Sequence, residues 1–236
     1  MYVIDLEAIR EKERQSHIQM YSDSTLFDSE GWLKKPIKTV LELLPHLENR
    51  NNPRILDLGC GIGRNAIPIA KQLQNQGCQV DCVNILELAI EKLRFYAKLH
   101  GVAAEINPIL SPIESYPISE NVYDLILCVS ALEHVDCEAA FTKKLHEMET
   151  GVKKGGLVCC VINSQVTEAD AVTGQPMPAQ FEVNWETQAL LELLNTFFHG
   201  WKQRKVTVRP QTYEIPRGDR QNVLHTNVLT FVAEKS

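Results

Sequence analysis

The stretch Ile55-Leu56-Asp57-Leu58-Gly59-Cys60-Gly61-Ile62-Gly63-Arg64-Asn65 decides the fold of this chain. The apolar residues before Gly59 predict a buried strand, and a helical pattern begins at Asn65. Glycines at alternate positions let the backbone between them turn sharply and approach a ligand with no Cβ in the way. The N–H groups at the start of the helix then face that ligand. Strand, glycine turn and helix together predict a nucleotide-type binding site.

The composition is that of one globular domain. The 236 residues are 44% hydrophobic and 23% charged, and 24 basic against 30 acidic residues give a net charge of −6. This acidic balance argues against a protein whose role is to bind the phosphate backbone of a nucleic acid. No apolar run approaches the length needed to span a membrane. We therefore expect neither a nucleic-acid nor a membrane partner, and the oligomeric state stays open.

The cysteines and the N-terminal residues indicate a compartment. The 7 cysteines form no pair of Cys-x-x-Cys motifs, and several lie in apolar stretches such as Val158-Cys159-Cys160-Val161. This pattern favours buried, reduced thiols over a zinc site or disulfides. Residues 1–15 are rich in charged side chains and contain no apolar segment typical of a signal peptide. We expect a cytoplasmic protein.

Strand and helix patterns alternate along most of the chain, which predicts a parallel sheet with helices on both faces. The expected strands are 54–58, 79–84, 104–110, 123–130 and 157–162, and the expected helices are 36–47, 65–76, 86–100 and 139–152. Lys153-Lys154-Gly155-Gly156 is expected to cap the last of these helices.

The C-terminal third has a different pattern. Residues 164–183 are predicted to form a long polar loop, followed by a helix over 184–198 with Asn184 as its N-cap. Two strands over 201–209 and 222–233 are expected to form an antiparallel pair at the edge of the sheet.

Two features of the glycine turn argue against a dinucleotide-dependent oxidoreductase. The dinucleotide pattern requires a third glycine three residues after the second, and counting from Gly59 and Gly61 this position holds Arg64. Asp57 also places a charge in a strand that is usually apolar before such a turn.

Both features occur in class I S-adenosylmethionine-dependent methyltransferases, whose first motif the stretch Leu56–Gly63 resembles almost residue for residue. Tyr123-Asp124-Leu125-Ile126 resembles their fourth-strand motif, and Lys154-Gly155-Gly156-Leu157 resembles the turn into their fifth strand. The resemblance covers roughly residues 36–163 and the closing hairpin. It implies a single Rossmann-like α/β domain whose seven-stranded, mostly parallel sheet ends in an antiparallel strand.

The resemblance also divides the domain, 1–236, into three parts and implies a cofactor. Residues 1–35 form a helical lid segment, 36–163 the cofactor-binding core, and 164–236 the acceptor loop, helix and closing hairpin. The implied cofactor is S-adenosylmethionine, with Asp57 near its methionine amino group and the glycine turn around its methionine and ribose portions. The residues expected to bind it are Asp57, Gly59, Cys60, Gly61, Gly63, Asn84, Ile85, Pro112, Ile113 and Ser130.

The sequence departs from the family at two acidic positions. The acid that normally binds the ribose hydroxyls at the end of the second strand is replaced by Asn84, which keeps an acceptor oxygen but loses the charge. Asp81 cannot substitute for it, because residues three apart on a strand face opposite sides. The adenine-side acid after the third strand is also missing, since Ser111-Pro112-Ile113 occupies that region.

Two methyltransferase subfamilies are similar to different parts of the chain. Gly63-Arg64-Asn65 and the Pro-containing segment 175–181 resemble tellurite-resistance and thiopurine methyltransferases. Residues 128–135, with the pair Glu133-His134, resemble ubiquinone-pathway O-methyltransferases, in which further acids help to hold a divalent metal. The earlier acid position here is Ser130, so no metal is expected. The substrate is not decided by these motifs.

The candidate catalytic residues are His134 and Arg217. His134 follows the fourth strand at the edge where such sheets bind ligands, so it is either a general base or acceptor-positioning group, or a structural residue of that junction. Arg217 is either an anchor for an anionic acceptor or a solvated loop residue. Glu133 is interpreted as a solvated or capping carboxylate.

Two segments are candidates to close over the acceptor. These are 164–183, with Met177 and Phe181, and the aromatic stretch 21–32, with Tyr21, Phe27 and Trp32. The function that follows is S-adenosylmethionine-dependent methyl transfer to a small-molecule acceptor. The alternatives are a catalytically weak or inactive module that binds adenosylmethionine or adenosylhomocysteine, and the less favoured oxidoreductase.

Overall fold

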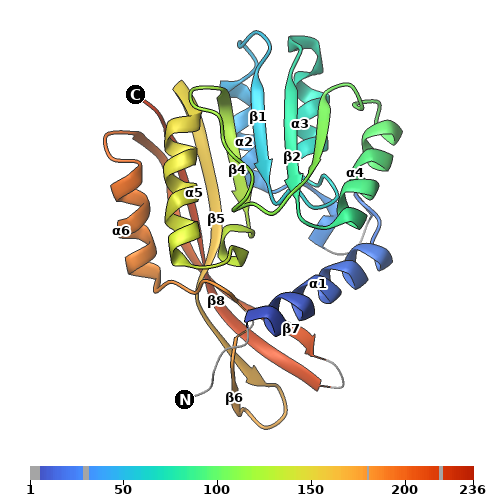
Figure 1. Cartoon of the computed structure of the whole chain (residues 1–236), viewed down its shortest axis with the longest axis vertical. Coiled ribbons are helices and arrows are strands. Elements are labelled where there is room, and N and C mark those ends of the chain that lie inside the picture. Colours follow the sequence, from blue (N-terminus) through green and yellow to red (C-terminus); the bar gives the residue numbers. More distant parts are fainter. Residues whose placement is uncertain (1–5, 29–31, 180, 218–219) are drawn as a thin grey trace.

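The computed structural model of the chain describes residues 6–28, 32–179, 181–217 and 220–236. Its centre is one sheet with the strand order β3-β2-β1-β4-β5-β8-β7, to which β6 is added beside β5 (Figure 1). Strands β1 to β5 run parallel to their neighbours, and β8 runs antiparallel to both β5 and β7. The expected α/β class and the antiparallel last strand are confirmed, and β6 makes the sheet 8-stranded.

The strands are β1 (Arg54–Leu58), β2 (Gln79–Asn84), β3 (Ile106–Leu110), β4 (Tyr123–Val129), β5 (Val152–Asp170), β6 (Pro176–Met177), β7 (Lys202–Arg217) and β8 (Arg220–Glu234). The α-helices are α1 (Leu6–Asp23), α2 (Lys38–Leu43), α3 (Ala66–Leu73), α4 (Glu87–Leu99), α5 (Glu138–Gly151) and α6 (Thr187–Phe197). Short 3-10 helices cover Trp32–Lys34, Leu44–His46, Gln74–Gln76 and Leu132–His134.

Helices cover both faces of the sheet. On one face α2, α3 and α4 contribute side chains such as Val40, Ile67 and Leu93 to one buried cluster. On the other face α5 and α6 contribute Phe141 and Leu190 to a second cluster. Successive strand residues point to opposite faces, so the central strands must be apolar at nearly every position to supply both clusters.

One carboxylate aligns the amino ends of three neighbouring strands. The Asp124 side chain, near the start of β4, is 5% exposed, and its Oδ1 accepts a hydrogen bond from Arg50 Nη1 at 2.7 Å. Its Oδ2 accepts from the Arg54 backbone amide at 2.8 Å and from Lys153 Nζ at 2.7 Å. Burial alone would raise the pKa of Asp124, but these hydrogen bonds outweigh it and hold the pKa below its usual range.

The structure corrects the prediction that residues 164–183 form a loop. β5 continues to Asp170 and pairs with β8, and after a turn the chain returns as β6. We call the projecting parts of these strands, residues 164–177, 210–217 and 220–227, the arm (Figure 1). Its residues alternate between buried and exposed from 164 to 168 as in any strand. The inward positions include Ser164 and Glu168. Because these residues are polar, the sequence does not show the alternation of apolar and polar residues that is typical of a strand.

Three local expectations were also wrong. Residues 153–156 do not cap α5, which ends at Gly151, but belong to β5. Asn184 does not cap α6, which begins at Thr187; its side chain instead exchanges hydrogen bonds with the backbone of Val166. The two closing strands are longer than expected, because they continue into the arm.

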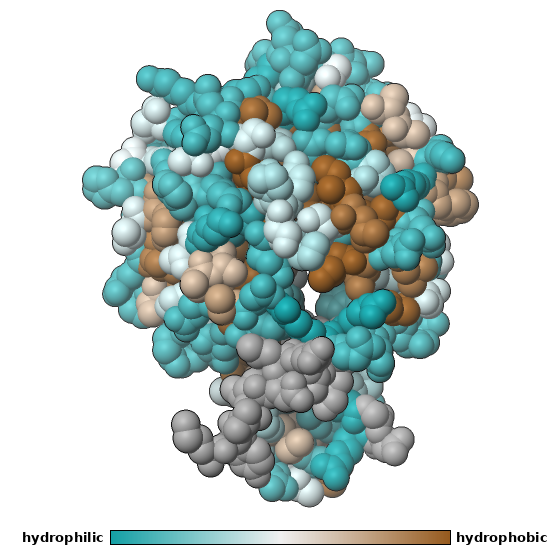
Figure 2. Space-filling view, in the orientation of Figure 1, coloured by the Kyte–Doolittle hydropathy of each residue, from teal (hydrophilic) through white to brown (hydrophobic). Residues whose placement is uncertain are grey.

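The surface of the arm differs from that of the sheet edge. In Figure 2 the coloured atoms that can be seen at the lower end, where the arm lies, are mostly hydrophilic, whereas apolar atoms gather on the side of β3 and α4. The exposed apolar side chains of these two elements include Phe95, Leu99 and Leu110. Among the residues that the structure describes, no helix is long and apolar enough to cross a membrane.

We predict that Asp124→Asn lowers the free energy of unfolding by about 1.5–3 kcal/mol at pH 7, because three hydrogen bonds to a charged group are weakened. The folded-state pKa of Asp124 is depressed, so its contribution is present above the unfolded pKa of about 3.9 and is lost as the pH falls through the folded value. Urea denaturation of both proteins should therefore give a difference that shrinks below about pH 4. The exposed Glu120→Gln serves as the control, and a pH-independent difference would contradict the prediction.

Candidate active site

The carboxyl ends of β1, β2 and β4 and the segment after β3 border one cavity of about 450 Å³. Open parallel sheets bind ligands at this edge, because the loops that leave the strands there diverge. The residues that line the cavity are Arg10, Glu11, Arg14, His17, Tyr21, Gly59, Asn84, Ile85, Leu86, Pro112, Ile113, Glu114, Ser130, Ala131, His134 and Glu182.

The glycine turn after β1 has the backbone conformation that its sequence predicted. Gly59, Gly61 and Gly63 have φ values of +76°, +54° and +98°, a region that L side chains rarely adopt. A Cβ on Gly61 would also lie 2.8 Å from the hydroxyl of Tyr21, which comes from α1. The glycines therefore allow both the turn and the close approach of a side chain from the N-terminal helix.

Asp57 lies beneath this turn with an unsatisfied oxygen. The residue is 1% exposed, and its Oδ2 has no hydrogen-bond partner among the described residues. Burial raises the pKa of Asp57 to about 7, and the nearby Arg64 guanidinium opposes that rise. A buried carboxylate without a full set of donors is unfavourable by itself. The site therefore fits a cationic donor brought by a ligand, such as the ammonium group of S-adenosylmethionine.

Asn84 ends β2 and lines the cavity. Its Oδ1 accepts a hydrogen bond from the Leu86 amide at 2.9 Å, which fixes the side chain at the sheet edge. Asp81 lies elsewhere, in contact with Arg54, Asn107 and Tyr123, so the expectation that it faces away from the site is consistent with its contacts. Ile85, which follows Asn84, is 62% exposed and presents an apolar surface at the mouth of the cavity.

The structure brings most of the predicted site residues together. Those that line the cavity are Gly59, Asn84, Ile85, Pro112, Ile113, Ser130 and His134. Asp57, Cys60, Gly61 and Gly63 do not line it and belong to β1 and the turn directly behind its wall.

Arg217 is not brought to the cavity. It ends β7 in the arm, where its Nε donates to Glu168 Oε1 at 3.0 Å and its Nη2 to Oε2 at 3.2 Å. Asn222 also donates to Glu168 Oε1, at 2.6 Å. The geometry therefore gives Arg217 an ion-pairing role within the arm and does not place it beside His134.

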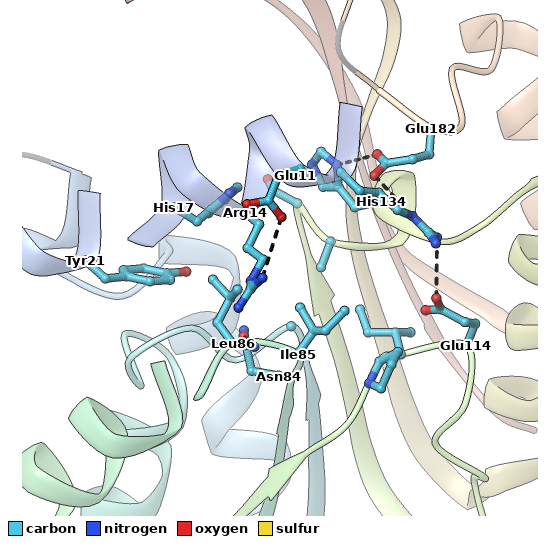
Figure 3. Close-up of a pocket in the computed structure, with 16 residues that line it drawn as sticks. Glu11, Arg14, His17, Tyr21, Asn84, Ile85, Leu86, Glu114, His134 and Glu182 are labelled. Carbon is cyan, nitrogen blue, oxygen red and sulfur yellow. Dashed lines mark hydrogen bonds and ion pairs between the residues drawn. The ribbon is translucent and has the colours of Figure 1, made fainter. Parts of the chain in front are cut away.

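The N-terminal helix forms a roof over the cavity, which we define as the α1 residues Arg10, Glu11, Arg14, His17 and Tyr21. Figure 3 shows the labelled members of this roof on the side opposite Asn84, Ile85 and Leu86. Arg10, Arg14, His17 and Tyr21 recur at intervals of four, three and four along the helix, so they share one face, and Glu11 lies next to Arg10 at its border.

Ion pairs and hydrogen bonds hold the two ends of the roof. Near its start, Arg10 pairs with Asp136, with Glu114 at 3.6 Å and with Glu182 at 3.9 Å. At its end, Lys92 Nζ donates to the backbone oxygens of Tyr21 and Ser24. Four separate segments, which contain Lys92, Glu114, Asp136 and Glu182, thus contact α1 and hold it over the cavity.

The expected lid is only partly found. Met177 lies in β6 and does not line the cavity, and from the segment 164–183 only Glu182 does so among the described residues. From the aromatic stretch 21–32, Tyr21 lines the cavity, whereas residues 29–31, the Trp32 side chain and Gln180 lie outside the described part. Most of the cover comes instead from earlier turns of α1.

His134 contributes the imidazole of the site. Its Nδ1 lies 3.0 Å from Glu182 Oε2, and its ring stacks on Phe181 with a centroid distance of 5.1 Å. The ring of His17 on the roof lies edge-on at 6.3 Å. Figure 3 shows the dashed contact between His134 and Glu182 on one side of the cavity.

Glu133 has a different environment from its neighbour. It is fully buried, and its Oε1 accepts hydrogen bonds from the backbone amide and the side chain of Asn163 at 3.1 and 2.7 Å. The prediction of a solvated or capping carboxylate was therefore wrong. The described residues contain no group of three or more His, Cys, Asp or Glu side chains suited to a metal ion.

Residues 1–35 were expected to form a helical lid segment, but apart from Tyr21 the residues of the roof and the acid beside His134 were not predicted. The missed lining residues are Arg10, Glu11, Arg14, His17, Leu86, Glu114, Ala131 and Glu182. The spacing of Arg10, Arg14, His17 and Tyr21 was the available signal. A polar helical face normally indicates contact with solvent, so this spacing alone did not point to a site.

Comparisons with known proteins agree with this geometry. Residues 55–156 match a family described as a methyltransferase domain. Ubiquinone biosynthesis O-methyltransferase of Rickettsia felis is 35% identical over 95 residues, which are 40% of this chain and 36% of that protein. The chain thus spans little more than a third of the length of this curated relative.

Two solved structures share the fold. TehB of Haemophilus influenzae superposes with a TM-score of 0.62 and 19% identity, over 85% of this chain and 62% of that one. A geranyl diphosphate methyltransferase in complex with SAM superposes with a TM-score of 0.56 and 15% identity, over 84% of each chain. The chain is therefore similar to methyltransferases in residues 55–156 and in fold, and its glycine turn and Asp57 lie inside the matched residues.

We predict that adenosylhomocysteine protects the roof and not the arm tip from amide exchange. A ligand at about 100 times its Kd can slow exchange that requires opening of the site by up to about 100-fold. Residues 11–21 of α1 should show this protection, while the turn at 171–175 serves as the internal control. Protection of the turn without protection of α1 would contradict the assignment of α1 as the cover.

Proposed function

We propose that this protein transfers a methyl group from S-adenosylmethionine to a small molecule bound beneath α1. The observation that carries the proposal is the unsatisfied, buried Asp57 carboxylate under a glycine turn that opens on the cavity. When bound, the cofactor supplies an electrophilic methyl group, so the chain must mainly orient a nucleophile and exclude water.

Each wall of the cavity receives a role in this proposal. Asp57 holds the ammonium group of the cofactor, and the turn 59–63 accommodates its methionine and ribose portions. Asn84 accepts from the ribose hydroxyls, while Ile85, Pro112 and Ile113 contact the adenine. Ser130, which lies at the end of β4 with φ of +49°, borders the methyl group.

The closed cavity supports a small-molecule acceptor. A helix held by Arg10 and Lys92 lies across the opening, which leaves little access for a macromolecular substrate. The names of two of the proteins compared above refer to small molecules. One is a ubiquinone biosynthesis O-methyltransferase, and the other is a geranyl diphosphate methyltransferase. We place the reaction in the cytoplasm, because all seven cysteines are free and six of them are buried.

Calorimetry with adenosylhomocysteine tests cofactor binding directly. Binding, followed by turnover to adenosylhomocysteine with a panel of small acceptors, would support the enzyme. Binding without turnover of any acceptor would instead favour the inactive binding module, and binding of NAD alone would favour an oxidoreductase.

We predict that Asp57→Ala weakens adenosylmethionine binding at least tenfold, because a charge-assisted hydrogen bond contributes about 1.5–3 kcal/mol. The pKa of Asp57 is raised to about 7, and the ammonium group binds the ionised form. Affinity should therefore fall as the pH is lowered from about 7 to 5.5, by up to about tenfold for each unit.

Calorimetry of the wild type and of Asp57→Asn over this pH range checks the assignment. The neutral amide in the variant cannot titrate, so it serves as the matched control and should lack the acidic loss of affinity. An equal pH dependence in both proteins would remove Asp57 from the ammonium site.

We predict that Asn84→Asp tightens binding of adenosylhomocysteine. One carboxylate oxygen can keep the hydrogen bond from the Leu86 amide, while the other supplies an ionised acceptor for a ribose hydroxyl. A gain of about threefold to tenfold, or about 0.7–1.4 kcal/mol, is expected. Unchanged affinity in a titration of the folded variant would show that Asn84 does not face the ribose.

A further inference from the structure

The cavity contains a second acidic centre, at the end away from Asp57. Arg10 lies there, and the carboxylates of Glu114, Asp136 and Glu182 surround its guanidinium. We call these three acids and Arg10 the acidic corner. Glu114 and Glu182 line the cavity, whereas Asp136 does not. Figure 3 shows the two lining acids at the end of the cavity away from Tyr21.

The charges of the acidic corner do not balance. Three carboxylates meet one guanidinium, so two negative charges are left over. The closest partner of Arg10 is Asp136, whereas Glu114 Oε1 lies 3.6 Å from its Nη2 and Glu182 Oε1 lies 3.9 Å from its Nε, both beyond hydrogen-bond distance. Glu182 Oε2 lies 3.0 Å from His134 Nδ1, and counting this ring as a cation still leaves an excess of negative charge.

The acids of the corner that line the cavity are also poorly solvated. The side chains of Glu114 and Glu182 are 18% and 3% exposed. Two further charged residues of the lining, Arg14 and Glu11, pair with each other at 3.5 Å and are 62% and 54% exposed, so solvent screens them. An excess of buried negative charge is unfavourable until a cation meets it. The corner therefore fits a cation that a ligand brings.

We propose that the acceptor of the methyl group carries a cationic nitrogen group, such as a protonated amine, which binds between Glu114 and Glu182. The proposal rests on the methyl transfer proposed above and specifies its acceptor. A protonated amine has up to three N–H donors and can therefore reach both carboxylates. Leu86 and Ala131 line the same cavity and are available to an apolar body attached to the amine.

The same charges disfavour other acceptors. A carboxylate or phosphate group at the corner would meet Glu114 and Glu182, and Arg10 is already surrounded by acids. Like charges at short range repel, so such a group would have to displace a carboxylate from the guanidinium. An uncharged acceptor would leave the negative excess uncompensated. The expected order of affinity is cation, then neutral compound, then anion.

Calorimetry of the protein saturated with adenosylhomocysteine tests this order with probes that differ mainly in charge. One series is phenethylamine, 2-phenylethanol and phenylacetate, and a second is hexylamine, hexanol and hexanoate. Near pH 7 the amines are protonated, because the pKa of a primary alkylamine such as lysine is about 10.4. In at least one series the amine should bind at least about tenfold more tightly than the alcohol, and the carboxylate should bind most weakly. Equal affinities, tighter binding of the carboxylates, or no binding of either amine would overturn the proposal.

Variants locate the amine. Glu114→Gln and Glu182→Gln keep the size of each side chain and remove its charge, so each should weaken binding of the preferred amine about tenfold and change that of the matching alcohol less than about twofold. Glu138→Gln is the matched control, because it removes an exposed carboxylate two residues from Asp136 that does not line the cavity. It should leave amine affinity within about twofold of the wild type. An equal loss in all three variants would show that net charge, and not the corner, attracts the amine.

Charge reversal gives an independent readout. Glu114→Lys places an ammonium group in the corner, so the carboxylate probes should then bind more tightly than the amines. An unchanged preference for amines in this variant would remove Glu114 from the site. Adenosylhomocysteine affinity should be unchanged in every variant, which shows that the cavity is folded. Absence of adenosylhomocysteine binding in the wild type would reject the methyltransferase function itself, whereas binding without any preference for amines would reject only the proposed acceptor.

Discussion

The burial of the Asp57 carboxylate is the constraint around which the active site is arranged. Its desolvation raises the pKa to about 7 and leaves one oxygen without a partner among the described residues. The carboxylate can be compensated only from the side of the glycine turn, because apolar residues of β1, β2 and β4 surround it on the sheet. Gly61 in this turn carries no Cβ, so the hydroxyl of Tyr21 can approach it closely.

The opposite ends of the parallel strands have the complementary role. There Asp124 is fully hydrogen-bonded, to Arg50, Arg54 and Lys153, and its pKa is lowered where that of Asp57 is raised. The two buried acids belong to adjacent strands but to opposite edges of the sheet. The satisfied carboxylate stabilises the fold, whereas the unsatisfied one is the group to which the proposed function assigns the ammonium of the cofactor.

The sequence predicted the parts of the structure that depend on local pattern. Apolar runs located β1, β4 and the middle of β5, and the glycine spacing located the turn, because these signals are complete within a few residues. The arm was missed because its inward positions hold Ser164 and Glu168, whose burial depends on distant partners such as Arg217. The residues of the roof other than Tyr21 were missed for a related reason, although residues 1–35 were expected to form a lid segment. A polar helical face indicates solvent unless carboxylates from other segments are known to meet it, and only the folded chain shows Arg10 beside Glu182.

The roof connects the two acidic centres of the cavity. Tyr21 lies over the glycine turn above Asp57, and Arg10 lies beside Glu182, which holds His134. Eleven residues of α-helix separate them, a distance of about 16 Å along the axis. One helix therefore covers both the end of the cavity beside the glycine turn and the end that contains His134 and Glu182. Movement of α1 at either end must alter the other, so binding of the cofactor and closure over the acceptor are expected to be coupled through this helix.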